Sequence, residues 1–378
     1  MIPEIPALDS THKKVARRLE WIDVAKGIGV FVVFYCHATW QNVPPWDHLP
    51  VSFVMPMYFI LAGLTYNNKK YRSNLKQFAV SRGKQFMIPY FILMALWITM
   101  VALVPSTSIQ PASDLVFWFA YGAGPPSGSP HLWFLPMLYL GMMVFVIFDK
   151  FLEKLPEYSR WFLVLFFILV TILLNEYVAI ILLQAFPYTT GLIPWRLGGV
   201  FMTAAFVALG NQIRRYIKLR DWTIGHLALD VGSIIGFSMI LVAVSTINGF
   251  TDIASDNIGI IYPVHFSVWL YLTTGIIGTY ITFVISALIV KLTTRFNNFM
   301  VRIGNSSQQL YELHPLVLRG AAPFLGIFGI IVTDPVAMAP QLWVYNYIFI
   351  AVISIPLIFY VVNRIAILRF IFTGSTKE

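Results

Sequence analysis

Near its N-terminus the chain reads Trp21-Ile-Asp-Val-Ala-Lys-Gly-Ile-Gly-Val-Phe-Val-Val-Phe-Tyr-Cys-His37. Asp23 and Lys26 are the only charged residues in this stretch, and both lie near its start. An apolar run of about 20 residues is long enough to cross the hydrocarbon core of a bilayer as a helix. The stretch therefore predicts a transmembrane helix from Ile22 to Thr39. A polar tail precedes it, so we expect a retained span and not a cleaved signal peptide.

The rest of the chain repeats this pattern, with apolar runs of similar length separated by polar segments. Ten spans are predicted in all, and the fifth, which Asn175 and Glu176 interrupt, could instead form two short helices. The nine further spans run from Val51 to Tyr66, Phe86 to Val104, His131 to Phe148, Trp161 to Phe186, Ile193 to Gly210, Ile224 to Ile247, Phe266 to Val290, Ser306 to Val332 and Leu342 to Val362.

The composition of the 378-residue chain supports a membrane protein. Apolar residues make up 58% of the chain and charged residues 11%, whereas soluble domains have about 45–50% and about 25%. This composition excludes a water-soluble protein, and the many aromatic residues exclude a disordered one. The single cysteine, Cys36, excludes an intrachain disulfide and a thiolate metal cluster, and we expect no metal.

The basic residues predict which side of the membrane each loop faces, because short cytoplasmic loops are enriched in Lys and Arg. Of the 26 Lys and Arg residues, 23 lie in the N-terminal tail, in the segments after the second, fourth, sixth and eighth spans, and after the tenth. Both termini are therefore expected in the cytoplasm. This placement, beside anionic lipid headgroups, accounts for the net charge of +9 without a nucleic-acid partner.

We expect one all-α membrane domain of about ten helices over residues 21–365. Cytoplasmic tails are expected over residues 1–20 and 366–378.

Lys26, Arg196 and Arg319 are the basic residues left within predicted spans. Charges inside a membrane are costly and commonly functional, although Lys26 could also extend to the cytoplasmic rim and pair with Asp23. Lys26 and His37 are eleven residues apart, almost three helical turns, so both emerge on one face about 16 Å apart. A histidine in this position can equally form an ordinary interhelical hydrogen bond. Cys36 is a competing nucleophile, but a buried free cysteine is usually inert.

The ninth span carries Ser307, Tyr311 and His314 on one helical stripe. Such a polar stripe faces the bundle interior or a cavity, for chemistry or for interhelical hydrogen bonding. Motifs of nucleotide-binding loops, zinc proteases and serine hydrolases are missing from the sequence.

Five segments, taken together and in order, resemble the acyltransferase 3 family, in its fucose-acetylase-like branch. They are the first span quoted above, Met55-Pro-Met-Tyr-Phe-Ile-Leu-Ala-Gly63, Lys84-Gln-Phe-Met-Ile-Pro-Tyr-Phe91, His131-Leu-Trp-Phe-Leu-Pro136 and Gly304-Asn-Ser-Ser-Gln-Gln-Leu-Tyr-Glu-Leu-His314. The resemblance implies an integral membrane O-acyltransferase of the bacterial inner membrane. Such proteins move an acetyl group from cytoplasmic acetyl-CoA to a sugar hydroxyl of an exopolysaccharide, lipopolysaccharide or other envelope glycan.

The resemblance also implies roles for individual residues. A basic residue and a histidine eleven positions apart on the first helix are essential in the family, and they match Lys26 and His37. His37 is expected to act as general base. Lys26, Arg82 and Lys84 are expected to bind the CoA phosphates, with Arg82 and Lys84 in the loop after the second span, where many members carry paired arginines.

For the acceptor sugar we expect His131 and Trp133, with Tyr311 and His314 as further substrate contacts. The alternatives are a secondary transporter, which often shows two related halves that are not detected here, or a glycan-export component without catalysis.

Overall fold

The computed structural model describes residues 20–39, 46, 48–72, 74–103, 111–122, 132–189, 192–214, 227–249, 264–327 and 342–375, and within these ranges every regular element is a helix. The α-helices are α1 (Glu20–Thr39), α2 (His48–Thr65), α3 (Asn68–Tyr71), α4 (Leu75–Leu103), α5 (Ala112–Tyr121), α6 (Phe134–Phe151), α7 (Trp161–Leu173), α8 (Ala179–Ala185), α9 (Leu197–Ile213), α10 (Leu227–Asn248), α11 (Val264–Leu292), α12 (Thr294–Asn305), α13 (Ser307–Ile327), α14 (Leu342–Leu357) and α15 (Ala366–Thr373). The remaining short elements are 3₁₀ turns at Glu157–Arg160, Pro187–Thr189 and Pro194–Arg196, and π-helical turns at Leu174–Val178 and Ile358–Val362.

The prediction of an all-helical, polytopic membrane protein is confirmed. Eight helical segments in the described part of the chain are long and apolar enough to cross a membrane. They correspond to α1, α2, α4, α6, the continuous α7–α8 segment, α10, α11 and α14 with its π turn. The other two predicted spans coincide with α9, which has 17 residues, and with α13, which carries more polar residues.

Several predicted boundaries were wrong. The helix expected from Phe86 begins at Leu75, so Arg82 and Lys84 lie within α4 and not in a loop. Its first turns are polar, they contact α15 and the cavity wall, and apolar length alone does not detect them. Asn175 and Glu176 do not break the fifth span, because a π turn at Leu174–Val178 accommodates them within one helix.

Two amphipathic helices lie where the sequence predicted only loop and tail. The first, α12, connects α11 to α13, and the second, α15, occupies part of the predicted C-terminal tail at 366–378. Each is short: α12 carries its apolar residues mainly on one face, and the eight residues of α15 are too few to span a membrane. Spans are recognised by continuous hydrophobicity, and such helices lack it.

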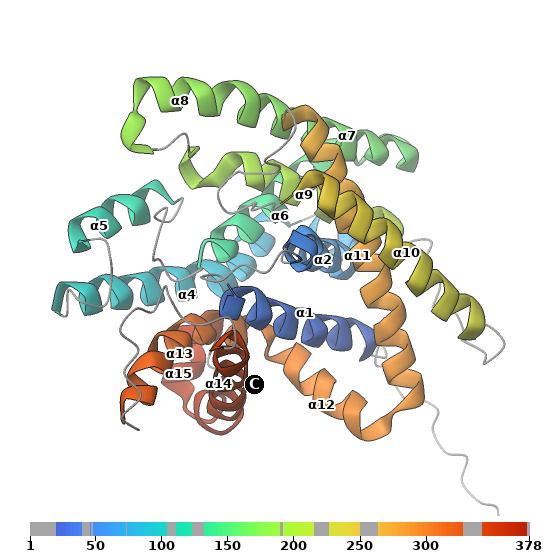
Figure 1. Cartoon of the computed structure of the whole chain (residues 1–378). Helices are drawn as coiled ribbons and strands as arrows, with labels where there is room; N and C mark the ends of the chain where they lie inside the picture. Colours follow the sequence, from blue (N-terminus) through green and yellow to red (C-terminus); the bar gives the residue numbers. More distant parts are fainter. Residues whose placement is uncertain are drawn as a thin grey trace, which may run out of the picture.

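The helix that carries Lys26 and His37 lies in the middle of the bundle. Figure 1 shows α1 beside α2, with α12, α13 and α14 on its other side. Gly304 of α12 contacts the backbone of Asp23 so closely that a β-carbon at position 304 would overlap the Asp23 carbonyl oxygen. This close approach holds α12 against the first turn of α1.

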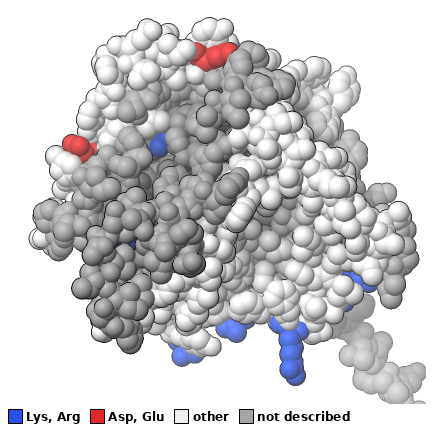
Figure 2. Space-filling view, viewed as in Figure 1, with Lys and Arg blue, Asp and Glu red and all other residues white. Residues whose placement is uncertain are grey.

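The described charged side chains are separated on the molecular surface. On the face shown in Figure 2, Lys and Arg lie mainly along the lower edge, and the Asp and Glu side chains lie at the left and upper edges. A broad white surface lies between them on the right of the view, and further basic atoms are visible at the left. This distribution matches a protein that crosses a bilayer, because charges avoid the hydrocarbon core.

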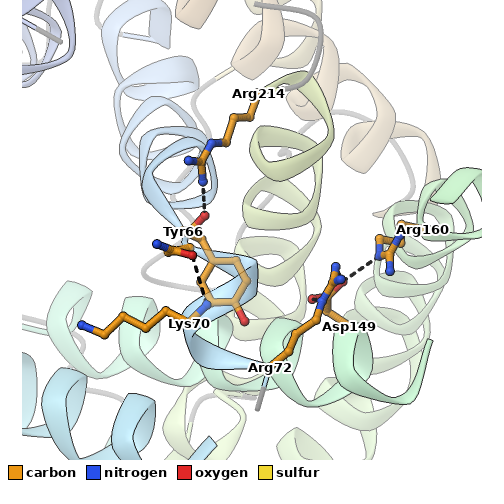
Figure 3. A network of polar contacts seen from close by, with 7 residues as sticks. Tyr66, Lys70, Arg72, Asp149, Arg160 and Arg214 are labelled. Carbon is orange, nitrogen blue, oxygen red and sulfur yellow. Dashed lines mark hydrogen bonds and ion pairs between the residues drawn. The ribbon is translucent and has the colours of Figure 1, made fainter. Parts of the chain in front are cut away.

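A buried ionic cluster joins the segments that follow α3 and α6 (Figure 3). Asp149, fully buried on α6, accepts hydrogen bonds from Arg72 (Nε–Oδ2 2.5 Å, Nη2–Oδ1 2.8 Å) and from Arg160 (Nε–Oδ1 2.8 Å). Burial alone would lower the pKa of Arg72, but the hydrogen bond and the charge of Asp149 raise it above its usual value. Nearby, Arg214 donates to the backbone carbonyl of Tyr66, which links the end of α9 to the end of α2. The carboxylate of Asp149 thus holds two basic segments together.

Candidate active site

A cavity of about 230 Å³ lies among α1, α2, α4, α6, α12 and α13. One part of its wall is polar or charged and the other is apolar. The polar lining residues are Lys26, Tyr58, Thr65, Arg82, Gln85, Asn305, Ser307, Gln308 and Tyr311. The others are Met55, Leu61, Ala62, Phe86, Phe134, Leu138, Met142 and Gly304.

Two cations from different helices line this cavity. Lys26 of α1 lies 3.4 Å from Oδ1 of the buried Asp23, one turn back on the same helix. Arg82 of α4 donates from Nη1 to Oε1 of Gln85 at 2.5 Å. The Nε of Arg82 is also buried, and it has no hydrogen-bond partner among the residues that the structure describes. Lys26 pairs with Asp23 and also lines the cavity, so both of the roles considered for this residue fit the structure.

A histidine pair lies farther along α1. Nδ1 of His37 and Nε2 of His314 are 2.7 Å apart, and the two rings stack with their centroids 4.7 Å apart. His314 is fully buried, and its Nδ1 lies 3.1 Å from the carbonyl oxygen of Leu310. A carbonyl only accepts, so Nδ1 of His314 carries a proton, and in the neutral imidazole its Nε2 then accepts from Nδ1 of His37. This sequence of hydrogen bonds makes Nε2 the basic nitrogen of His37.

Aromatic rings connect the cavity to the histidine pair. Phe134 and Tyr311 both line the cavity, and their ring centroids are 5.0 Å apart. The Tyr311 ring lies 5.8 Å from that of His314, the partner of His37. The cations and the histidines, which the sequence placed about three turns apart on α1, thus belong to one continuous region.

The structure brings together most of the residues predicted for the site. Lys26, Arg82 and Tyr311 line the cavity, and His37 contacts His314. The stripe of Ser307, Tyr311 and His314 faces the interior, as its spacing predicted.

Three of the predicted residues do not join this group. Lys84 is exposed on the surface of α4 and does not line the cavity, because two positions along a helix rotate a side chain about 200° away from Arg82. Trp133, at the N-terminus of α6, is half-buried and packs beside Phe134 outside the cavity. His131 lies outside the described residues.

Sequence analysis missed several polar residues near Arg82. Tyr58 donates from its hydroxyl to the carbonyl oxygen of Lys26 at 2.9 Å and so ties α2 to α1. Gln85 and Gln308 line the cavity, and the buried Glu312 accepts a hydrogen bond from Gln308. Gln308 and Glu312 are four residues apart on a helix predicted to lie in the membrane. This spacing places them on one face, and it could have marked both residues as candidates from the sequence.

Lys26 is one of three basic residues within predicted spans, and the other two, Arg196 and Arg319, do not lie at this cavity. Arg319 of α13 places its guanidinium 4.2 Å from the ring centroid of Trp97, a cation–π contact. Arg196 is buried at the start of α9, where it and Trp195 both adopt a left-handed backbone conformation. Neither arginine lines the cavity that holds Lys26.

Comparison with known proteins identifies the family. A family model described as an acyltransferase domain matches residues 19–363, which include every helix from α1 to α14. No match was found among curated proteins or among solved structures. Because the family model covers most of the chain, this multi-pass membrane protein belongs to the acyltransferase 3 family.

Proposed function

We propose that this acyltransferase moves an acetyl group from acetyl-CoA to a sugar hydroxyl of an envelope or exported glycan. The observation that carries the proposal is that two cations and apolar side chains line one cavity, and that Tyr311 of this cavity contacts the histidine pair. In this proposal the cations bind the coenzyme and the histidine pair activates the acceptor. The membrane is the inner membrane of a bacterium, with the basic ends of the helices in the cytoplasm, where acetyl-CoA is made.

The coenzyme end of the site consists of Lys26 and Arg82. Phosphate oxygens accept charge-assisted hydrogen bonds from both types of cation. At about 230 Å³ the cavity is smaller than pockets for complete drug-sized ligands, which occupy about 300–1,000 Å³. It therefore suits the linear, thioester-bearing arm of the coenzyme, with the nucleotide outside. The apolar residues Met55, Leu138 and Met142 offer this arm a matching surface.

The histidine pair supplies the general base. Nε2 of His37 takes the proton of the sugar hydroxyl while that oxygen attacks the thioester carbonyl carbon. The carbon–sulfur bond then breaks, the coenzyme leaves as a thiolate, and the thiolate takes up the proton from His37. An ester and free CoA result. Tyr311, which lies between the cavity and His314, is the proposed donor to the oxyanion of the intermediate.

On the acceptor side, His131 and Trp133 are the proposed sugar contacts. An indole ring offers an apolar face on which a sugar ring can stack, and Trp133 lies next to Phe134 of the cavity wall. The acceptor thus approaches from the side opposite to the coenzyme, and the acetyl group passes between the two along α1.

A transfer assay tests this function. Membranes that contain the protein are incubated with acetyl-CoA labelled in the acetyl group, and label in the glycan fraction is counted. The variant His37→Ala should lose about 100-fold to 10,000-fold in rate, the usual contribution of a general base.

The control is His48→Ala, because His48 is another histidine near a helix end, lies 3.1 Å from Oγ1 of Thr246 through its Nε2 and does not line the cavity. Wild-type rates in His37→Ala would refute the role of His37. Absence of any acetyl transfer by the wild-type protein, with flux of a small solute instead, would indicate a transporter.

A further inference from the structure

A chain of hydrogen-bonded side chains connects Arg82 to a buried carboxylate on another helix. We propose that Gln85, Gln308 and Glu312 are positioning residues that fix the direction of the Arg82 guanidinium toward the coenzyme. This inference rests on the proposed function, because it assigns a task to residues around the same cavity. None of the three residues is proposed to contact the reacting atoms.

The geometry of the chain is continuous from α4 to α13. Arg82 donates from Nη1 to Oε1 of Gln85 at 2.5 Å, and Nε2 of Gln85 donates to Oε1 of Gln308 at 3.1 Å. Nε2 of Gln308 in turn donates to Oε1 of Glu312 at 2.9 Å and to the backbone oxygen of Gln85 at 2.8 Å. Both amides thus use their oxygen and their nitrogen at the same time.

Glu312 sets the direction of every hydrogen bond in the chain. Oε1 of Glu312 accepts and the backbone carbonyl of Gln85 also accepts, so the amide group that faces both must be the nitrogen of Gln308. The oxygen of Gln308 therefore faces Gln85, and the oxygen of Gln85 faces Arg82. If either amide were reversed, two acceptors or two donors would face each other inside the protein, which is costly at a buried site. Glu312 itself is 1% exposed, so the inner end of the chain is buried in the protein.

The consequence for Arg82 is a fixed orientation. One nitrogen of the guanidinium is held by Gln85, and its buried Nε has no hydrogen-bond partner among the described residues. Guanidinium donors lie in a rigid plane, so fixing one nitrogen fixes the direction of the others. A phosphate then meets a preorganised donor, and less side-chain entropy is lost on binding.

A purely structural tie between α4 and α13 would use the same contacts, so the test must separate the two roles. The matched variants are Gln308→Leu and Gln309→Leu, which are neighbours on α13. Each removes an amide that bonds to a distant part of the chain, since Gln309 donates from Nε2 to Oδ1 of Asn363 at 2.8 Å. Only Gln308 belongs to the chain that ends at Arg82.

The measurement uses the purified full-length protein in detergent, with KM for acetyl-CoA and kcat determined separately. Losing an oriented hydrogen bond to a charged group commonly costs about tenfold or more in an equilibrium constant. Gln308→Leu should therefore raise KM about tenfold with kcat within about twofold of wild type, and Gln309→Leu should leave KM within about twofold. Glu312→Gln should raise KM in the same direction, because its amide no longer enforces the order of donors and acceptors.

A double-variant comparison decides whether the chain acts through Arg82. In an Arg82→Ala background, Glu312→Gln should have no further effect on KM, since the group it orients is gone. An equal increase of KM in both backgrounds, or an equal effect of Gln308→Leu and Gln309→Leu, would overturn the inference. Binding of CoA to the wild-type protein is measured first by calorimetry. If the wild type binds no CoA the proposed function fails, whereas normal binding with unchanged variants refutes only the positioning role.

Discussion

Because Asp149 is buried between two arginines, we expect its substitution to lower the thermal stability of the protein. Asp149 is 0% exposed and holds Arg72 and Arg160, whose side chains are 17% and 2% exposed. The substitution Asp149→Asn keeps the size of the side chain and removes its charge. Two guanidinium groups then face each other around a neutral amide. Nη1 of Arg160, which already has no partner among the described residues, remains buried.

The size of the effect follows from the ion pairs that are lost. At about 4 Å and an effective dielectric constant of about 20, one pair of unit charges attracts by about 4 kcal/mol. Part of this attraction offsets the cost of removing the charges from water, so the net value of the intact cluster is smaller. Removing one partner leaves that cost uncompensated, and the observed loss for a buried pair is about 3–5 kcal/mol. Each kcal/mol lowers Tm by about 2–4 °C in mid-sized domains, so a decrease of about 10 °C is expected.

Thermal unfolding of the purified protein in detergent, followed by intrinsic tryptophan fluorescence, measures this change. The control is Glu153→Gln, which removes an exposed carboxylate four residues further along the chain. Neither residue lines the cavity, so KM for acetyl-CoA should stay at its wild-type value in both variants below the unfolding temperature. A Tm for Asp149→Asn within about 2 °C of wild type would show that the cluster does not stabilise the fold.

Three further predictions concern the site and the topology. Lys26→Ala should raise KM for acetyl-CoA more than Lys26→Arg does in steady-state assays, because either cation can meet a phosphate; equal KM values for the two variants would remove Lys26 from the coenzyme site. Cys36→Ser should keep most of the acetyl transfer, because Cys36 is buried beside the histidine and the proposed reaction needs no acyl-cysteine; loss of activity with a trapped acyl-cysteine would contradict this. In a Cys36→Ser background, a cysteine at Tyr188 should react with a membrane-impermeant maleimide in intact cells, whereas one at Asn74 should react only after lysis; labelling at Asn74 in intact cells would invert the topology.

The membrane fold could be predicted from the sequence because hydrophobicity alone decides it. Continuous apolar runs marked α1, α2, α6, α10, α11 and α14 to within a few residues. Where polar residues enter a helix the prediction failed, as in the first turns of α4 and in the short amphipathic α12 and α15. These helices are stabilised by contacts with the rest of the protein, and tertiary contacts cannot be read from local composition.

Periodicity predicted part of the candidate site. The eleven-residue spacing of Lys26 and His37, and the stripe that contains Tyr311 and His314, each give positions on a single helix. The contact between His37 and His314 joins residues 277 positions apart, and no local pattern encodes it. Its four-residue spacing from Glu312 could have marked Gln308, but no local pattern shows that Gln308 bonds to Gln85 on α4.

The hydrogen bonds of the histidine pair also bear on energy coupling. They run from His37 through His314 and end at the carbonyl oxygen of Leu310, which cannot take up a proton and pass it on. In the proposed reaction, the proton taken from the sugar hydroxyl is held at Nε2 of His37 and needs no route through His314. It leaves on the departing thiol, and no net charge crosses the bilayer during a catalytic cycle. The rate of acetylation at saturating substrate should then be insensitive to the transmembrane potential, and the thioester alone supplies the driving force.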